Sequence, residues 1–306
     1  MNLGPARMSA FGGMEDESLV HDFTIPWTSV VEFVVSRWVD VNGVRTHFLE
    51  SGGAREDSPV LLMVHGWAGS AVDWERLMPL LPPGVRAIAV DLPGCGLSDK
   101  PDAAYDMPFF IDAILSFCES LGVSRMVLAG HSMGGQIAVH FTSRYPERVE
   151  KLILIDPAGL KGEEGGLAAL ARLGPVVDLA LQLNTRFFIE WAMRANILHD
   201  APPDLVASAV EGTATSILGQ KSARAISRIT QRVIGREHVD ELLPGVSQET
   251  LLIWGDADRL LSPRWADEYV SRLRRASVHP VAGAGHMPMF EKPEAVAALI
   301  ADFIAP

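Results

Sequence analysis

The stretch LAGHSMGGQIAV, residues 128–139, places Ser132 between two glycines, Gly130 and Gly134, and decides how the rest of the chain is interpreted. An apolar run precedes the serine, and a segment with helical spacing follows it. A G-x-S-x-G pentapeptide also arises by chance, so the surrounding sequence has to give it meaning. A strand before it and a helix after it would put Ser132 on a sharp turn with its hydroxyl exposed.

Composition indicates one large globular domain or a domain with an insertion. The chain has 306 residues, of which 48% are hydrophobic, and a formal net charge of −12. A chain of this length can bury a sizeable core without disulfides or metal. The largest basic cluster is Arg272, Arg274 and Arg275, whose spacing is typical of one solvated helix face. This charge distribution argues against nucleic acid and anionic membrane as partners.

Cysteine content and the first residues bear on the compartment. Cys95 and Cys118 are too few for a disulfide framework or a cysteine zinc site, which favours a reducing environment. Residues 1–20 carry acidic side chains and lack the continuous apolar run of a signal peptide or membrane anchor. We therefore expect a cytoplasmic protein.

The sequence predicts an α/β fold with an open, mostly parallel sheet. Continuous aliphatic runs that end at a turn are typical of strands buried on both faces, and helical segments separate them, which indicates right-handed crossovers. Residues 37–53, RWVDVNGVRTHFLESGG, predict a hairpin, because Asn42-Gly43 suits a two-residue turn. The strand-like runs are PVLLMVHG (59–66), VRAIAVDLPG (85–94), RMVLAG (125–130), KLILID (151–156) and TLLIWG (250–255).

Residues 157–246 interrupt this alternation. They contain long helical stretches and no comparable strand, and they exceed the length of an ordinary crossover. We therefore expect a core of residues 36–156 and 247–306, a helical cap of residues 157–246, and an N-terminal extension of residues 1–35. The extension is apolar enough to pack either on the cap or on a second subunit, so a homodimer is one of two expected arrangements.

If Ser132 is a nucleophile it requires a base, because a serine hydroxyl is a weak nucleophile until its proton is removed. His286 is the best candidate, since it lies in a glycine-rich loop between the last strand and the last helix, at the carboxyl end of the sheet. His131 lies inside the turn, where its side chain points opposite to that of Ser132. His140, His199 and His279 fall in a helix, in the insertion and in a strand.

A carboxylate must hold the second nitrogen of that imidazole. Asp258 follows the strand that ends at Gly255 and is the favoured acid, because the order Ser, Asp, His suits this architecture. Asp156, at the end of KLILID, is the competing candidate. The oxyanion requires two backbone donors, for which we expect the amides of Trp67 and Met133.

Five motifs together resemble the alpha/beta-hydrolase fold family, in particular its capped, esterase-like members. They are HGWAGS (65–70), DLPGCGLSD (91–99), GHSMGG (130–135), WGDADRLLSP (254–263) and GAGHMPMFEKP (283–293). The resemblance extends from about residue 36 to the last residue. It implies Ser132 as nucleophile, His286 as base, Asp258 as acid and a helical cap, with no metal or organic cofactor.

The sequence limits the substrate class less sharply. We expect a carboxylesterase for small to medium apolar esters, with a pocket lined by Trp67, Phe187, Trp191 and Met287. A carbon-carbon hydrolase of the meta-cleavage type is the alternative, with Arg194 as a carboxylate clamp, although His131 and HGWAGS depart from that pattern. A third hypothesis is a ligand receptor on the same fold that binds without turnover.

Overall fold

The computed structural model describes residues 34–52, 58–163 and 186–305. Residues 1–33 of the predicted N-terminal extension and residues 164–185 of the predicted cap lie outside these ranges. The strands are β1 (Val34–Val41), β2 (Val44–Ser51), β3 (Val60–Val64), β4 (Arg86–Val90), β5 (Met126–His131), β6 (Val149–Ile155), β7 (Glu249–Gly255) and β8 (Ala276–Val281). The α-helices in the described ranges are α1 (Met107–Ser120), α2 (Met133–Arg144), α5 (Arg186–Ala192), α6 (Pro203–Ile217), α7 (Gln220–Arg232), α8 (Trp265–Arg272), α9 (Pro288–Glu291) and α10 (Pro293–Ile304).

Within the described residues, eight strands form one sheet in the order β1-β2-β4-β3-β5-β6-β7-β8. Strands β3 to β8 run parallel to one another, and the β1-β2 hairpin adds the antiparallel edge. Asn42 and Gly43, the two turn residues of the hairpin, have φ of 54° and 83°. Both lie in the left-handed region that the predicted tight turn requires. The α/β class, the mostly parallel sheet and the hairpin are therefore confirmed.

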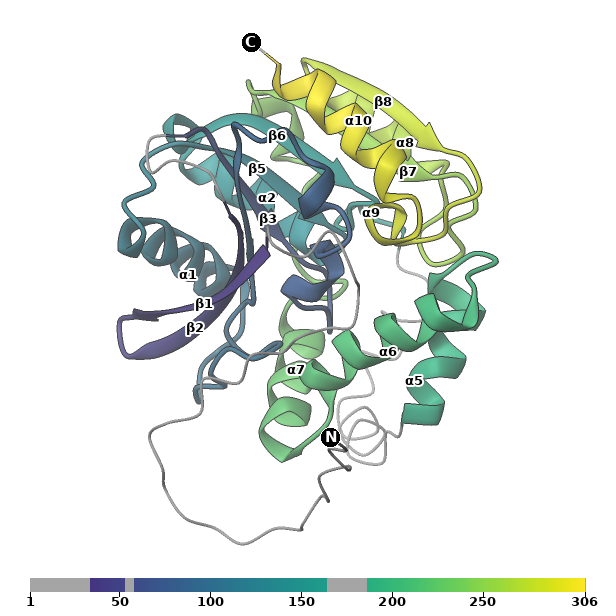
Figure 1. Cartoon of the computed structure of the whole chain (residues 1–306). Coiled ribbons are helices and arrows are strands. Elements are labelled where there is room, and N and C mark those ends of the chain that lie inside the picture. Colours follow the sequence, from purple (N-terminus) through teal and green to yellow (C-terminus); the bar gives the residue numbers. More distant parts are fainter. Residues whose placement is uncertain (1–33, 53–57, 164–185, 306) are drawn as a thin grey trace, which may run out of the picture.

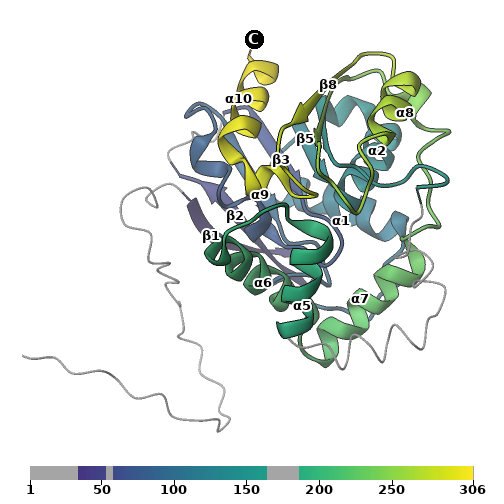
Figure 2. The same ribbon diagram turned by 90° about the vertical axis from the view of Figure 1, so that its right-hand side faces the viewer.

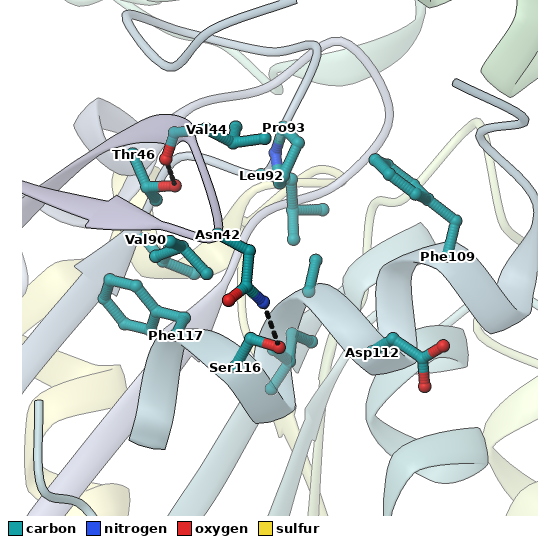
Figure 3. Close-up of a pocket in the computed structure, with 13 residues that line it drawn as sticks. Asn42, Val44, Thr46, Val90, Leu92, Pro93, Phe109, Asp112, Ser116 and Phe117 are labelled. Carbon is teal, nitrogen blue, oxygen red and sulfur yellow. Dashed lines mark hydrogen bonds between the residues drawn. The ribbon is translucent and has the colours of Figure 1, made fainter. Parts of the chain in front are cut away.

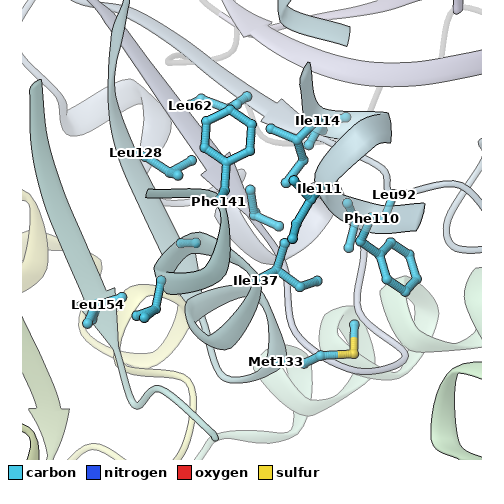
Figure 4. Packing of buried hydrophobic residues seen from close by; sticks show 14 of the residues in the cluster. Leu62, Leu92, Phe110, Ile111, Ile114, Leu128, Met133, Ile137, Phe141 and Leu154 are labelled. Atoms are coloured by element: carbon cyan, nitrogen blue, oxygen red, sulfur yellow. The ribbon is translucent and has the colours of Figure 1, made fainter. Parts of the chain in front are cut away.

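Alternate residues of each central strand face opposite sides of the sheet and enter separate hydrophobic clusters. Leu62 and Val64 pack toward α1, α2 and α8, whereas Leu61 and Met63 pack toward α10. Figure 4 shows part of the first cluster, in which Phe110 and Ile114 of α1 and Ile137 and Phe141 of α2 gather with Leu62 and Leu128 of the sheet. This burial on both faces explains why the strands are aliphatic throughout rather than alternating.

The helices of residues 186–232 lie together beside the sheet, as both views show (Figures 1 and 2). Their buried side chains divide between the two clusters: Ile226 and Ile229 of α7 join the first, and Ile189 of α5 and Val206 of α6 join the second. A π-helical turn, Met193–Ile197, continues α5. No helix in the described ranges is long and apolar enough to cross a membrane.

The turn from β5 into α2 positions Ser132. Ser132 has φ 52° and ψ −120°, a conformation that residues with a Cβ rarely adopt. Two backbone hydrogen bonds hold it there: its amide donates to Ile155 O at 3.0 Å, and its carbonyl accepts from the Ala158 amide at 3.0 Å. On either side the glycines are required, because a Cβ on Gly130 would lie 2.3 Å from Gly134 O, and a Cβ on Gly134 would lie 2.2 Å from Val64 O.

We expect Gly134→Ala to destabilise the fold by about 3 kcal/mol or more, because backbone atoms rather than a movable side chain oppose the new methyl group. The free energy of unfolding, measured by urea denaturation, tests this. Gly245→Ala is the control, since a Cβ there meets nothing within 4 Å, and it should change stability by no more than about 1 kcal/mol. Equal stability of the two variants would contradict the close approach at the turn.

The conformation of Ser132 predicts an inverted order of stability for two substitutions. Ser132→Gly should be more stable than Ser132→Ala by about 1 kcal/mol, because only glycine is free of strain at this φ and ψ. At Ser277, an exposed position in β8 without positive φ, alanine should be the more stable of the two. Thermal unfolding of the four variants gives both comparisons, and a more stable alanine at position 132 would exclude strain at the turn.

Candidate active site

Three of the predicted residues lie on loops that follow parallel strands at their carboxyl ends. Ser132 follows β5, Asp258 follows β7 and His286 follows β8. All three are buried, with 8%, 6% and 3% of their surface exposed. In an open parallel sheet this edge is where ligands bind. The fold thus brings these loops to the same edge of the sheet.

His286 and Asp258 form a direct hydrogen-bonded pair. His286 Nδ1 lies 2.7 Å from Asp258 Oδ2, while Asp258 Oδ1 accepts the amides of Leu260 and Leu261 at 2.7 and 2.9 Å. Burial alone would raise the pKa of Asp258, but the adjacent imidazole and these amides outweigh burial and lower it. Asp258 is therefore an anion. It holds the proton of His286 on Nδ1 and leaves Nε2 available as an acceptor.

The backbone around His286 is fixed by contacts that the sequence did not reveal. His131 Nε2 donates to His286 O at 2.7 Å, and the His286 amide donates to Ile197 O at 2.7 Å. Burial lowers the pKa of His131 to about 3, so its ring is neutral. His131 therefore supports the loop of His286 rather than acting as the base.

Glu291 fastens the same loop to residues 197–199. Its carboxylate accepts the amides of Gly285 and His199 at 3.0 and 2.7 Å, and that of Met287 at 3.2 Å. Gly285 permits this approach, because a Cβ there would lie 2.4 Å from Ile197 O. The only sequence signal was the position of Glu291 in the motif GAGHMPMFEKP, which gave no indication of its partners.

The two predicted oxyanion donors lie on neighbouring loops. Met133 is the first residue of α2, where backbone amides have no partner within the helix. Trp67 follows Gly66, and a Cβ on Gly66 would lie 3.0 Å from Ser132 Cβ, so the two loops are in contact. The indole of Trp67 donates to Thr230 Oγ1 in α7 at 2.8 Å. This bond ties the loop of Trp67 to α7, and the role of both amides as oxyanion donors stays a prediction.

Asp156, the competing acid, is also present at this edge. It is fully buried after β6, and its Oδ1 accepts the Gly255 amide at 3.0 Å. Donor atoms of Asp156, Asp258 and His286 all lie within 4.8 Å of one another, a spacing that a metal ion could bridge. The amides on Asp258 Oδ1 and the imidazole on Oδ2 already hold both oxygens of that carboxylate by hydrogen bonds, so the donor set fits a proton network better than a metal.

The four residues predicted to line a substrate pocket differ in exposure. Met287 is buried and Trp67 is half-buried, whereas Phe187 and Trp191 of α5 are 79% and 55% exposed. On that helix Ile189, rather than Phe187 or Trp191, faces the hydrophobic cluster. A lining role of the two exposed aromatic residues stays a prediction.

A cavity of about 190 Å³ lies away from these residues, between the β1-β2 hairpin and α1 (Figure 3). Apolar side chains such as Leu92, Phe109 and Phe117 line it, and at its rim Asn42 Nδ2 donates to Ser116 Oγ at 3.2 Å. None of its lining residues belongs to the loops that carry Ser132, Asp258 or His286. Its position gives it no part in the arrangement above.

The chain is similar to proteins named as hydrolases and esterases. The chain is 28% identical to 2-hydroxymuconate semialdehyde hydrolase of Pseudomonas sp. strain CF600, over 89% of this chain and 94% of that protein. It is 29% identical to a pimeloyl-[acyl-carrier protein] methyl ester esterase of Neisseria meningitidis, over 79% and 75%. The crystal structure of a membrane phospholipase A, a bacterial virulence factor, matches with a TM-score of 0.76 at 29% identity, covering 89% of this chain and 86% of that one.

The family model of the alpha/beta hydrolase fold matches residues 59–293, from the residue before β3 to the first residue of α10. This range includes every predicted site residue and most of the sheet. The chain therefore belongs to the alpha/beta hydrolase fold family.

Proposed function

We propose that this hydrolase is a serine carboxylesterase that cleaves small to medium apolar esters through an acyl-enzyme. The observation that carries the proposal is the buried pair of His286 and Asp258, 2.7 Å apart, at the same sheet edge as the strained turn of Ser132. Acyl transfer by a serine requires a base that a carboxylate orients and a serine held on a sharp strand-to-helix turn.

The first half of the reaction is acylation. His286 Nε2 takes the proton of the Ser132 hydroxyl as Oγ attacks the ester carbonyl carbon, and Asp258 stabilises the imidazolium that forms. The amides of Trp67 and Met133 hold the negative oxygen of the tetrahedral intermediate. The carbon-oxygen bond to the leaving group then breaks, and His286 gives its proton to the departing alcohol.

The second half is hydrolysis of the acyl-enzyme. His286 removes a proton from water, whose oxygen attacks the acyl carbon, and the same two amides hold the new oxyanion. The bond to Ser132 Oγ then breaks, Oγ takes back a proton from His286, and a carboxylic acid leaves. These steps use groups of the chain and water alone.

A carbon-carbon hydrolase is the second candidate, because one relative carries the name 2-hydroxymuconate semialdehyde hydrolase. The clamp considered for such a substrate was Arg194. Its side chain is 45% exposed and pairs with Glu190 one helical turn earlier at 3.0 Å. A half-exposed guanidinium that already has a carboxylate partner is a poor anchor for a substrate acid, which favours the esterase.

We expect Ser132→Ala to lower ester hydrolysis by about 10^4-fold or more, because the substitution removes the nucleophile and little packing. Hydrolysis of p-nitrophenyl butyrate measures this loss, and a fluorophosphonate should add its mass to Ser132 in the wild-type chain. Ser277→Ala is the control, since this serine is exposed in β8 and remote from the turn. Turnover by Ser132→Ala at the wild-type rate would refute the proposed mechanism.

Because the residues predicted to line the substrate pocket are apolar, we expect kcat/KM to depend on the length of the acyl chain. With p-nitrophenyl esters from acetate upward, each added methylene should raise kcat/KM by up to about fourfold, since burial of one methylene contributes about 0.8 kcal/mol. The rise should end at medium length, where the pocket is full. Rates that increase into long-chain emulsions would indicate a lipase, and turnover of a meta-cleavage dienoate with inert esters would establish the second candidate.

A further inference from the structure

The mechanism above leaves one buried ionisable group of the site without a role, the carboxyl of Asp156. Asp156 is 0% exposed and follows β6, directly beside the strand that leads to Asp258. Its Oδ1 accepts an amide, but its Oδ2 is buried and has no hydrogen-bond donor facing it. A buried carboxylate oxygen without a donor is costly, so the state of this group requires a physical explanation.

Another carboxyl, that of Asp258, lies near the carboxyl of Asp156. A side-chain oxygen of each residue and a ring nitrogen of His286 all lie within 4.8 Å of one another. Two carboxyls can hydrogen bond to each other only when one of them carries a proton, and two buried like charges this close repel strongly. One proton between them removes both the repulsion and the unsatisfied oxygen.

The contacts of the pair determine which carboxyl holds the proton. Asp258 accepts two backbone amides and the imidazole of His286, all of which favour its anion. Asp156 accepts one amide. Burial, followed by the negative charge of Asp258, raises the pKa of Asp156 well above its ordinary range, and Glu291 acts in the same direction.

We propose that Asp156 is a positioning residue that stays protonated in the active enzyme and donates its carboxyl hydrogen to Asp258. Asp258 then has four donors: two amides, the imidazole and the Asp156 hydroxyl. A carboxylate has about four acceptor sites, so this set is complete and fixes the plane in which Asp258 meets His286. The proposal rests on the proposed function only in assigning Asp258 as the acid.

The backbone conformation at position 156 suits both aspartate and asparagine. Asp156 has φ 41°, in the left-handed region, where Asn, Asp and Gly are the residues tolerated best. Asparagine has the shape of a protonated aspartate, since its carbonyl can accept the Gly255 amide while its NH2 donates to Asp258. Asp156→Asn therefore replaces one neutral donor by another, and Asp156→Gly removes the donor without adding backbone strain.

Difference infrared spectroscopy of the full chain tests where the proton lies. At pH 8 the wild-type spectrum minus that of Asp156→Asn should contain the C=O band of a protonated carboxylic acid, displaced in ²H₂O. Absence of this band would overturn the proposal. The measurement needs no substrate, so its outcome is independent of the esterase assignment.

The pH profile of Ser132 labelling by a fluorophosphonate gives a second test. Besides Asp156, the ionisable groups that face the base are Asp258, Glu291 and His131. In Asp156→Asn the acid limb of the profile should keep its midpoint, because no charge is removed. Loss of an ionised Asp156 would instead move the limb to lower pH by about one unit or more, and that result would overturn the proposal.

Asp156→Gly and Asp258→Asn complete the series. In Asp156→Gly, Asp258 keeps more of its charge for the imidazolium, so the acid limb should move to higher pH by about 0.5 to 1 unit. Asp258→Asn, the same substitution on the other carboxyl, should slow labelling by about 10^4-fold. A larger loss in Asp156→Asn than in Asp258→Asn would reverse the assignment of acid and donor. Absence of labelling in the wild type would refute the esterase while leaving the infrared result intact.

Discussion

The first turn of α2 lies directly against the end of β3, and the whole site depends on this contact between backbones. Gly134 comes so close to Val64 O and His65 O that no side chain fits between them. The contact places the loop of Trp67 beside Ser132, so that the nucleophile and both predicted oxyanion donors share one small volume. The strain at Ser132, of about 1–3 kcal/mol, persists because Ile155 O of β6 accepts its amide and the amide of Ala158, in the loop after β6, donates to its carbonyl. The strained turn thus lowers the stability of the fold but holds the Ser132 hydroxyl at a fixed place.

Burial disfavours the charged forms of His131, Asp156 and Asp258, which lie near the turn of Ser132. His131 is neutral because desolvation lowers its pKa to about 3, and Asp156 is driven toward its neutral form by burial and by Asp258. Asp258 keeps its charge through its hydrogen bonds. In such surroundings the field of one anion is weakly screened, so Asp258 would act strongly on the imidazolium that the proposed mechanism forms at His286. A second ionised carboxyl would over-stabilise that imidazolium and hinder return of the proton.

The sequence predicted what local pattern controls. Aliphatic runs that end at a turn located the five central strands, Asn42-Gly43 located the hairpin, and the position of Asp258 and His286 after strands placed them at one edge. The bonds from His131 to His286 O and from Glu291 to the amides around it were not predictable, because they join segments far apart in the chain through irregular backbone. The sequence could not indicate which apolar side chains of residues 186–192 are exposed, because the spacing of apolar residues does not say which of them faces the core; Ile189 is buried, whereas Phe187 and Trp191 are exposed.

Helices α5, α6 and α7 pack against both faces of the sheet. Buried side chains of α7 belong to the hydrophobic cluster on one face, and those of α5 and most of those of α6 belong to the cluster on the other, while Ile217 of α6 joins the first. Hydrogen bonds also join these helices and residues 197–199 to the predicted site: Thr230 accepts the indole of Trp67, Ile197 O accepts the amide of His286, and the His199 amide donates to Glu291, which also accepts the Gly285 amide. A displacement of residues 197–199 would break the contacts of Ile197 and His199 with the His286 loop and Glu291, so the positions of the two segments are coupled.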